Sequence, residues 1–291
     1  MFPSRFRYEA PRTIAEAISL LHAGGGEAKV LAGGQSLVPL LKLRFASPEL
    51  LVDINNLPDL AYHRLDEAGA LHIGALCRHA DLERSILLAD QQPTMIAAAP
   101  LIADPIVRTR GTLVGSLCHA DPQGDWAAVI TALGGMVVAH GPAGRRTIAI
   151  GDLVTGPFQN TLAYDEIAVE AIVPAAQGRL VGGFLKLERR VGDFATAGTA
   201  VAVELDGDRV LRAGIALSGV GGRTIDAREA ADSLTGQVLD QAAVARAADL
   251  AAAAAEPRSD HRGSAEYKRH VIHTFVTRIL TRVSPARTEA A

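Results

Sequence analysis

The feature of this sequence that most constrains its fold is an abrupt change of pattern in KVLAGGQSLVPLLKLR, residues 29–44. A short apolar run typical of a buried strand ends at Gly33 and Gly34, and a helix-like apolar segment, for which Ser36 is the predicted cap, runs to about Leu43. Glycine lets the backbone turn sharply and bring N–H groups close to a ligand, and a helix start favours an anion. The stretch therefore predicts either an ordinary turn or one half of a phosphate cradle.

A second glycine segment, RGTLVGSLCHADPQGDW at residues 110–126, favours the cradle. It combines small and hydroxyl residues, which suit a pyrophosphate, with Asp121 and Asp125, whose carboxylates suit a ribose hydroxyl or a flavin N–H. Neither GxGxxG nor GxxxxGKS/T occurs in the chain. Together the two segments predict a long, diphosphate-containing ligand. The alternative is two tight turns, with Asp125 capping a helix that starts at Trp126.

The remaining pattern divides the chain into three segments, as expected for 291 residues. Residues 1–56 have a β-α-β-α-β pattern, in which Thr13 and Glu16 predict a capping box. Residues 57–176 predict paired strands, a helix from Pro93 to about Ala103, and a long glycine-bearing loop before the Trp126 helix. Residues 177–291 predict strands followed by helices: strands at 184–190, 199–205 and 210–217, and helices at 227–234, 239–255 and 264–283.

The composition excludes several classes of protein. A formal charge of −3 gives no basic field for nucleic acid or an anionic membrane, and no apolar run approaches membrane-spanning length. The two cysteines, Cys77 and Cys118, exclude a disulfide scaffold and an iron–sulfur cluster held by four thiolates of this chain, and no metal-ligand cluster is expected. Since the N-terminus lacks a signal-like apolar core, a cytoplasmic protein is expected.

Three segments, in order and at similar spacing, resemble one family. KVLAGGQSLVPLLKLR, RTRGTLVGSLCHADPQGDW and KLERRVGDFATAGTA are similar to the FAD-binding medium subunits of molybdenum hydroxylases, the xanthine oxidase group, and most of all to the carbon monoxide dehydrogenase type. The resemblance implies an α+β protein with a vanillyl-alcohol-oxidase-type (PCMH-type) FAD-binding fold in two subdomains, residues 1–56 and 57–176. A C-terminal α+β domain of the CO dehydrogenase flavoprotein type, residues 177–291, follows.

The resemblance also implies which residues bind FAD. One loop would hold one side of the diphosphate, a second loop the other side, and Phe194 stands where the family often has a tyrosine beside the isoalloxazine ring. The full predicted set is Lys29, Leu31, Ala32, Gly33, Gly34, Gln35, Ser36, Leu37, Gly111, Thr112, Leu113, Val114, Gly115, Ser116, His119, Asp121, Asp125, Lys186 and Phe194. No residue of this chain is expected to act on the substrate of the complex.

Two positions depart from the family pattern. Val114 stands where the usual Thr-Ile-Gly-Gly loop has its first glycine. A β-branched residue avoids positive φ, so an extended or shifted backbone is expected there. Phe194 lacks the hydroxyl through which a tyrosine would hydrogen-bond to the flavin, although stacking or shielding is retained.

The function implied by the resemblance is electron transfer. The chain would be the FAD-binding oxidoreductase subunit of a heteromeric molybdenum hydroxylase, passing electrons from 2Fe–2S clusters of a small partner subunit to an external acceptor. The molybdopterin cofactor and substrate oxidation would lie on a large partner subunit, in a heterotrimer or its dimer. The alternatives are a stand-alone flavin reductase or oxidase of the same fold and a flavin-free structural subunit. The sequence names neither substrate nor acceptor.

Overall fold

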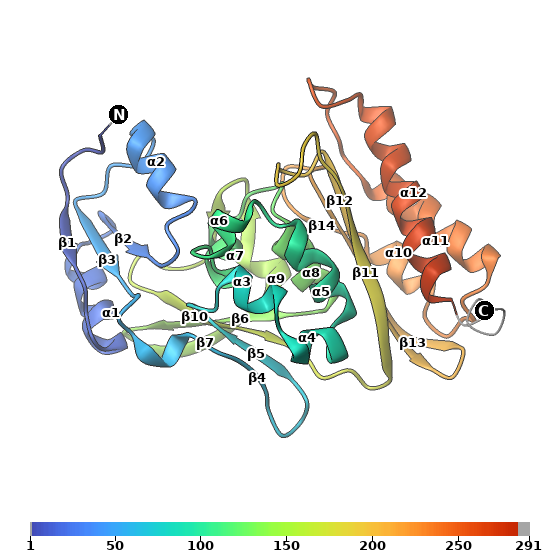
Figure 1. The fold of residues 1–291 in the computed structure, drawn as a ribbon, viewed down its shortest axis with the longest axis horizontal. Coiled ribbons are helices and arrows are strands. Elements are labelled where there is room, and N and C mark those ends of the chain that lie inside the picture. Colours follow the sequence, from blue (N-terminus) through green and yellow to red (C-terminus); the bar gives the residue numbers. More distant parts are fainter. Residues whose placement is uncertain (1, 285–291) are drawn as a thin grey trace.

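The structure, a computed structural model, describes residues 2–284 as three units in a row (Figure 1). The first unit has a three-stranded parallel sheet in the order β1-β3-β2, whose central Leu50 pairs with both Arg7 and Ala28. Its elements are β1 (Arg7–Glu9), α1 (Ile14–Ala23), β2 (Ala28–Leu31), α2 (Leu37–Leu43) and β3 (Leu50–Asp53). The predicted β-α-β-α-β order is confirmed.

Helix α1 begins where the sequence indicates, with one difference in its cap. Thr13 Oγ1 accepts the N–H of Glu16 at 3.1 Å, so Thr13 is the N-cap. The Glu16 carboxylate accepts the N–H of Arg12, at 2.9 Å, instead of the N–H of Thr13. The second half of the predicted capping box is therefore shifted by one residue.

The second unit is built on a five-stranded antiparallel sheet in the order β4-β5-β10-β6-β7, with helices over one face (Figure 1). Its strands are β4 (His63–Leu65), β5 (Leu71–Gly74), β6 (Met136–Gly141), β7 (Gly144–Ala149), β8 (Val154–Gly156), β9 (Gln159–Asn160) and β10 (Ile167–Val173). Its helices are η1 (Pro58–Leu60), α3 (His79–Glu83), α4 (Ile86–Gln91), α5 (Pro93–Ala98), η2 (Ala99–Leu101), α6 (Pro105–Arg108), α7 (Leu113–His119), α8 (Asp125–Ala132) and α9 (Ile150–Leu153).

This unit contains more helix than the sequence pattern predicts. The segment expected to be a long loop holds α6 and α7, and the helix that starts at Pro93 ends in a 3-10 turn at Leu101 instead of continuing to Ala103. Such short helices depend on capping and burial, which leave no full period in the sequence. In α7, the Thr112 side chain caps the helix, and Leu113 and Leu117 are buried.

The third unit has a four-stranded antiparallel sheet in the order β11-β12-β13-β14. Its elements are β11 (Arg179–Leu187), β12 (Ala197–Asp206), β13 (Arg209–Ser218), β14 (Ile225–Asp226), α10 (Arg228–Asp232), α11 (Gln241–Ala254) and α12 (Ala265–Val283). The strands-then-helices order is confirmed, although β11 lies earlier than its predicted range of 184–190. The domain boundaries predicted after residues 56 and 176 fall between elements, after β3 and after β10.

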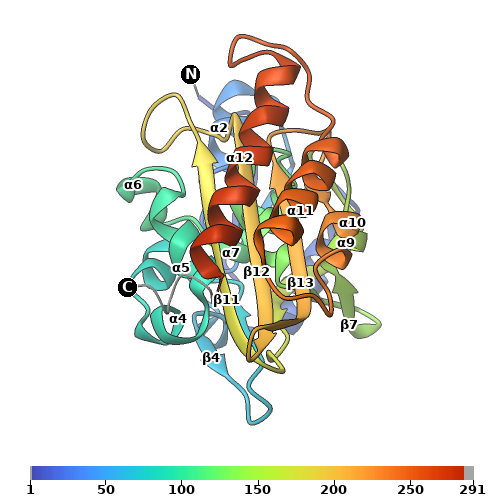
Figure 2. The same ribbon diagram turned by 90° about the vertical axis from the view of Figure 1, so that its right-hand side faces the viewer.

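Strand β12 is buried on both faces, because a layer of helices covers each side of its sheet. Ala200 and Ala202 belong to the core that includes α5 and α8, whereas Val201 and Val203 pack with α11 and α12. This division follows from the alternation of side chains along a strand. Figure 2 shows α11 and α12 lying across the outer face. Within residues 2–284, none of the helices has both the length and the apolarity needed to cross a membrane.

Candidate functional site

The first glycine loop connects β2 to α2 and lies directly against the second. Gly34 has a φ of +76°, a conformation that favours glycine. A Cβ atom on Gly33 would collide with the carbonyl oxygen of Arg110 and lie 2.9 Å from the Cα of Gly111. Ser36 occupies the N-cap position of α2, but its backbone is helical and its hydroxyl makes no capping bond. The prediction of a Ser36 cap is therefore wrong, and the hydroxyl is not committed to the helix.

The second glycine loop starts helix α7. The Thr112 hydroxyl accepts the N–H of Gly115 at 3.1 Å and so caps the helix. Val114 is buried in the first turn of α7. The expectation of an extended or shifted backbone at Val114 is therefore wrong, because a helical residue has negative φ and a β-branched side chain adopts it without strain. The valine does not distort the loop.

A buried histidine supports the second loop from below. His79 donates its backbone N–H to the carbonyl oxygen of Gly111 at 3.0 Å, and its ring lies where a Cβ on Gly111 would be only 2.7 Å away. Trp126 Nε1 donates to His79 Nδ1 at 3.0 Å. Burial, with smaller effects from the charges of Arg108 and Arg78, lowers the pKa of His79 to about 4. His79 is therefore neutral at physiological pH and requires a glycine above it.

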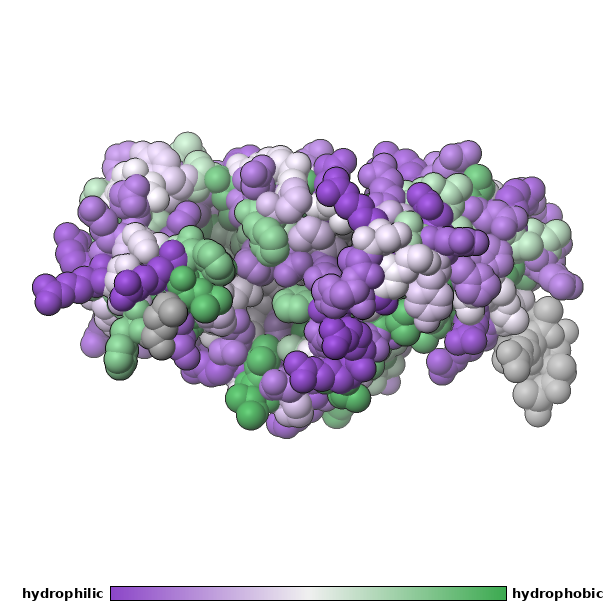
Figure 3. Space-filling model, turned by 90° about the horizontal axis from the view of Figure 1, so that it is seen from above, coloured by the Kyte–Doolittle hydropathy of each residue, from purple (hydrophilic) through white to green (hydrophobic). Residues whose placement is uncertain are grey.

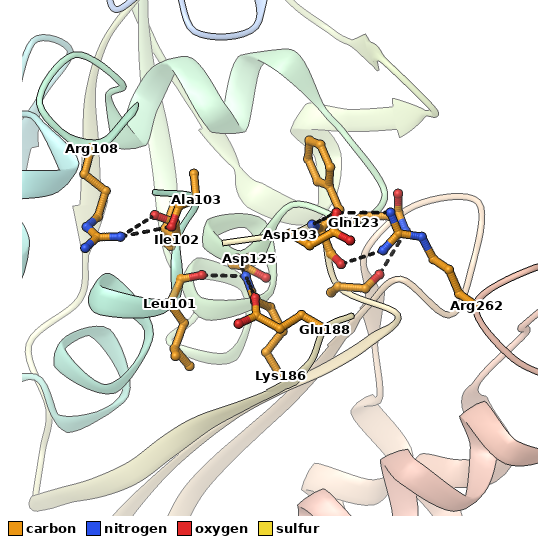
Figure 4. Close-up of polar contacts among 12 residues, drawn as sticks. Leu101, Ile102, Ala103, Arg108, Gln123, Asp125, Lys186, Glu188, Asp193 and Arg262 are labelled. Atoms are coloured by element: carbon orange, nitrogen blue, oxygen red, sulfur yellow. Dashed lines mark hydrogen bonds and ion pairs between the residues drawn. The ribbon is translucent and has the colours of Figure 1, made fainter. Parts of the chain in front are cut away.

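Asp125 and Lys186, both predicted site residues, form an ion pair between the second and third units (Figure 4). Lys186 comes from β11, and its side chain is 1% exposed. Its Nζ lies 2.9 Å from Asp125 Oδ2 and 3.3 Å from Glu188 Oε2. Asp125 is the first residue of α8 and makes no capping bond, since Gly124 is the N-cap. The capping alternative for Asp125 is therefore wrong. We call Asp125, Lys186 and Glu188 the charged cluster.

The charged cluster has more acceptors than donors. Burial raises the pKa of Asp125 to about 6, and the positive charge of Lys186 offsets only part of this effect. Among the described residues, Asp125 Oδ1 is buried without a hydrogen-bond partner, whereas Glu188 Oε2 has only its 3.3 Å ion-pair contact with Lys186 Nζ. Asp125 Oδ1 is thus available to accept a hydrogen bond from an N–H or O–H group of a ligand.

Two buried cations hold the segment that follows helix α5. Lys186 Nζ donates to the carbonyl oxygen of Leu101 at 2.5 Å. Arg108 Nη1 donates to those of Ile102 and Ala103, at 3.1 and 3.0 Å. These contacts stabilise the left-handed backbone of Ala103, whose φ is +49°. Figure 4 shows the cations approaching this segment from opposite sides. The segment Leu101–Ala103 beside the charged cluster is therefore held by hydrogen bonds to its backbone carbonyls, and no sequence pattern predicts such bonds.

Phe194 lies on the loop between β11 and β12, and hydrogen bonds to the loop backbone hold this loop in place. The Phe194 side chain is 51% exposed, and its carbonyl oxygen accepts a bond from Arg262 Nη1 at 2.8 Å. Arg262 Nη2 also lies 3.2 Å from Asp193 Oδ1 (Figure 4). Gln123 Nε2 donates to the carbonyl oxygen of Ala195 at 2.9 Å. Among the described residues, no hydrogen bond joins Phe194 to either glycine loop.

The other predicted residues lie at the edges of these features. His119 ends α7 with its ring 5.2 Å from that of Phe158, and burial lowers its pKa. Asp121 Oδ1 accepts the N–H of Gln123 at 2.9 Å, so it holds the turn towards α8. Three further predicted residues border the first loop: Lys29 and Leu31 in β2, and Leu37 at the start of α2.

The observed features fit an elongated ligand such as FAD. The first loop is half-exposed, and no side chain separates the two glycine backbones where they meet. Figure 3 shows the surface hollowed between the first unit and the rest of the molecule. Asp125 Oδ1 in the charged cluster adds an acceptor without a partner among the described residues. Sequence reasoning missed four residues that fasten these features: Asn55, Arg78, Glu188 and Arg262. Most of their partners are backbone carbonyls or distant in sequence.

Comparisons with known proteins agree with this description. The family model described as the FAD binding domain in molybdopterin dehydrogenase matches residues 4–176, and that of the CO dehydrogenase flavoprotein C-terminal domain matches residues 183–283. The chain is 40% identical to the carbon monoxide dehydrogenase medium chain of Hydrogenophaga pseudoflava, over 96% of this chain and 97% of that one. It is 38% identical to the 6-hydroxypseudooxynicotine dehydrogenase complex subunit alpha of Paenarthrobacter nicotinovorans, over 97% and 95% of the two chains.

A solved structure shows the same likeness in three dimensions. A chain of carbon monoxide dehydrogenase from Hydrogenophaga pseudoflava, in a form that lacks the Mo-pyranopterin moiety of the molybdenum cofactor, superposes with a TM-score of 0.92. The two chains are 41% identical, and the match covers 97% of this chain and 98% of that one. The likeness therefore includes all three units.

Proposed function

Because this chain belongs to the family of FAD-binding flavoprotein subunits of molybdenum-containing oxidoreductases, we propose that it is the electron-output subunit of such a complex. It takes electrons from 2Fe–2S clusters on a small partner subunit and delivers them to an external acceptor, while a large molybdopterin subunit oxidises the substrate. Bound flavin supplies the ability to exchange electrons singly or in pairs. Two cysteines cannot provide the four thiolates of such a cluster, so the clusters belong to another chain.

The contact between the two glycine loops is the observation that carries this proposal. Gly33 lies against Gly111, and each loop leads into a helix. In the first turns, Val38 and Gly115 donate their N–H groups to Gly34 and Thr112, and Pro39 has no N–H. Among the described residues, the N–H groups of Leu37, Leu113 and Val114 have no partner. We assign these N–H groups and the hydroxyls of Ser36 and Ser116 to the FAD diphosphate. The predicted residues from Lys29 to Leu37 and from Gly111 to Ser116 form this part of the site, and His119 and Asp121 support it.

The charged cluster is assigned to the other end of the ligand. Lys186 pairs with both carboxylates, while Asp125 Oδ1, which has no partner among the described residues, accepts a hydrogen bond from the ligand. With a pKa of about 6, Asp125 can hold or release a proton near neutrality. Phe194 covers the ring by stacking rather than by a hydrogen bond. The domains proposed for this fold comprise residues 1–56, 57–176 and 177–291.

The proposed assembly is a heterotrimer of this chain with the two partner subunits, or a dimer of that heterotrimer. The relatives compared above are a medium chain and a complex subunit, which supports a multisubunit context. Cys77 and Cys118 are free, and burial raises the pKa of each thiol to about 12. Free, unreactive thiols fit the reducing cytoplasm that we propose as its location.

Absorption spectroscopy tests the proposal directly. The chain is purified alone and with its co-purifying partners, its visible spectrum is recorded, and the released cofactor is identified. We expect a flavin band with FAD in both preparations and iron–sulfur absorption only when the partners are present. A colourless chain within a coloured complex would show that this subunit is a scaffold. A purified chain that oxidises a substrate without partners would identify a stand-alone flavoenzyme.

A further inference from the structure

Two polar side chains join the two glycine loops across the gap between the first and second units. Asn55, just after β3, donates through Nδ2 to the carbonyl oxygen of Ala32 at 2.9 Å. Arg78, just after β5, donates through Nη1 to the carbonyl oxygen of Arg110 at 2.7 Å and through Nη2 to Asn55 Oδ1 at 2.5 Å. We call this chain of bonds, from Ala32 through Asn55 and Arg78 to Arg110, the loop strut.

Both side chains of the loop strut are themselves held in place. Asp53 Oδ1 accepts the backbone N–H of Asn55 at 2.9 Å, and Asp53 Oδ2 accepts the Tyr8 hydroxyl at 2.6 Å. Arg78 donates its backbone N–H to Asp81 Oδ2 at 3.0 Å. Because the Asn55 amide donates to Ala32 and accepts from Arg78, only one orientation of the amide satisfies the strut. The strut is therefore a fixed connection rather than a transient surface contact.

The two carbonyls that the strut holds belong to the peptide groups that enter the glycine loops. A peptide group is planar, so fixing the Ala32 carbonyl also fixes the direction of the Gly33 N–H. In the same way, the Arg110 carbonyl shares its peptide plane with the Gly111 N–H, which donates to the Val107 carbonyl oxygen at 2.8 Å. The strut thus sets the orientation of both loop entrances and the spacing between them.

We propose that Asn55 and Arg78 are positioning residues that hold the two glycine loops in register for the FAD diphosphate. This inference rests on the proposed placement of the diphosphate between the loops. A ligand with phosphates in contact with two loops on different units requires a fixed separation between those loops. Arg78 acts through its fork geometry, because one guanidinium reaches the Arg110 carbonyl and the Asn55 amide at once.

The test measures FAD binding to the apo form of the full chain by flavin fluorescence. The variants are Arg78→Met, Arg78→Lys, Asn55→Leu and the double variant of Arg78→Met with Asn55→Leu. We expect each single variant to weaken FAD binding by about 10- to 100-fold, the range for losing a hydrogen bond to a charged group. The double variant should be no weaker than the singles, because both remove the same connection. Arg78→Lys should not restore binding, since an ammonium group cannot span both acceptors.

Arg146→Met is the matched control. Like Arg78, Arg146 donates through two nitrogens of its guanidinium: Nε and Nη2 each lie 2.7 Å from an oxygen of Glu166, and Nη2 also donates to the Thr161 carbonyl oxygen at 3.0 Å. It therefore fastens two segments of the second unit without joining the loops. We expect Arg146→Met to bind FAD within about twofold of wild type, while its apo thermal stability changes by as much as that of the strut variants.

Three results would overturn the inference. Wild-type FAD affinity in Arg78→Lys would mean that Arg78 acts only as a positive charge, and the deficit of Arg78→Met would then shrink at high salt. If the loss of FAD affinity in the double variant equals the product of the two single losses, the two residues act independently. Unchanged affinity in both Arg78→Lys and Asn55→Leu would remove the role, and these two variants suffice if Arg78→Met fails to fold. Loss of FAD by wild type itself would instead refute the proposed function.

Discussion

The glycine loops and the charged cluster represent opposite ways of building a binding site. At the loops, two backbones meet with no side chain between them, and a Cβ atom on Gly33 or Gly111 has no room. In the charged cluster, Lys186 and two carboxylates are buried together, and the chemistry lies entirely in the side chains. Adding one methyl group is expected to damage the loops, whereas removing one charge is expected to damage the cluster.

This difference also determines how each region depends on solution conditions. Backbone N–H groups do not titrate, so the loops should be insensitive to pH. The cluster contains Asp125, whose pKa is raised to about 6 by burial, and it must respond to pH near that value. The two regions should therefore differ both in the size of a mutation's effect and in pH dependence.

Removing the cation should have the largest effect on stability. Lys186→Met leaves Asp125 and Glu188 buried without a positive charge, and we expect a loss of about 3–5 kcal/mol in the free energy of unfolding. Lys268→Met is the matched control, because Lys268 is also buried but pairs with Asp260, which is 41% exposed. Urea denaturation of both variants measures the difference. A loss in Lys186→Met no larger than that in Lys268→Met would contradict the importance of the second carboxylate.

Adding a methyl group at the loop contact should have the next largest effect. In Gly33→Ala the new Cβ collides with the Arg110 carbonyl, so the loops must separate, at a cost of about 1–3 kcal/mol in stability. We expect FAD binding to fall by about 100-fold, measured by flavin fluorescence of the apo chain. Gly151→Ala is the control, because a Cβ there meets nothing within 4 Å. Equal FAD affinity in Gly33→Ala and Gly151→Ala would refute a close-packed cradle.

The pH dependence of stability should separate Asp125 from His79. Between about pH 4 and pH 6, Asp125 binds a proton in the folded chain but not in the unfolded chain, so its contribution to stability falls as pH rises. His79, with its pKa lowered to about 4, has the opposite sign, because the unfolded chain takes up the proton first. Comparing wild type with Asp125→Asn cancels the His79 contribution.

We therefore expect Asp125→Asn to gain stability relative to wild type from pH 4 to pH 6, by about 1–3 kcal/mol, and no further above pH 7. Urea unfolding at one-unit pH intervals measures this difference. A constant difference would mean that the pKa of Asp125 is not raised. A difference that changes in the opposite direction would mean that attraction to Lys186 outweighs burial.

Periodicity and turn chemistry in the sequence predict much of the fold but not its short helices. The first unit and the strands-then-helices order of the third follow from alternation, from glycine pairs and from the Thr13 cap. The sequence pattern does not predict helix α7, because TLVGSL contains a glycine and two β-branched residues. This composition is more typical of a loop or a strand. Its helical state comes from the Thr112 cap and from burial of Leu113 against the core, which no local pattern reveals.

The candidate site shows the same limit more sharply. The resemblance points to Asp125 and Lys186 as separate flavin contacts, but not to their pairing, because 61 positions separate them and nothing in the sequence pairs them. No sequence pattern indicates the roles of Asn55 and Arg78, since their acceptors in the loops are backbone carbonyls, which every residue has. Residues that act through the chemistry of their side chains can be predicted from sequence. Residues that act by hydrogen-bonding to a particular backbone carbonyl can be identified only from the structure.

Phe194 should show the smallest effect on stability, because its backbone, not its ring, makes the contacts that hold the loop. Phe194→Tyr is expected to change the free energy of unfolding by less than about 0.5 kcal/mol. If its ring covers the flavin, the added hydroxyl should still shift the visible absorption band, since it places a new dipole beside the chromophore. Val191→Thr, at a residue 92% exposed on the same loop, is the control and should leave the band unchanged. An unshifted band in Phe194→Tyr would mean that the flavin contacts only the loops and the charged cluster.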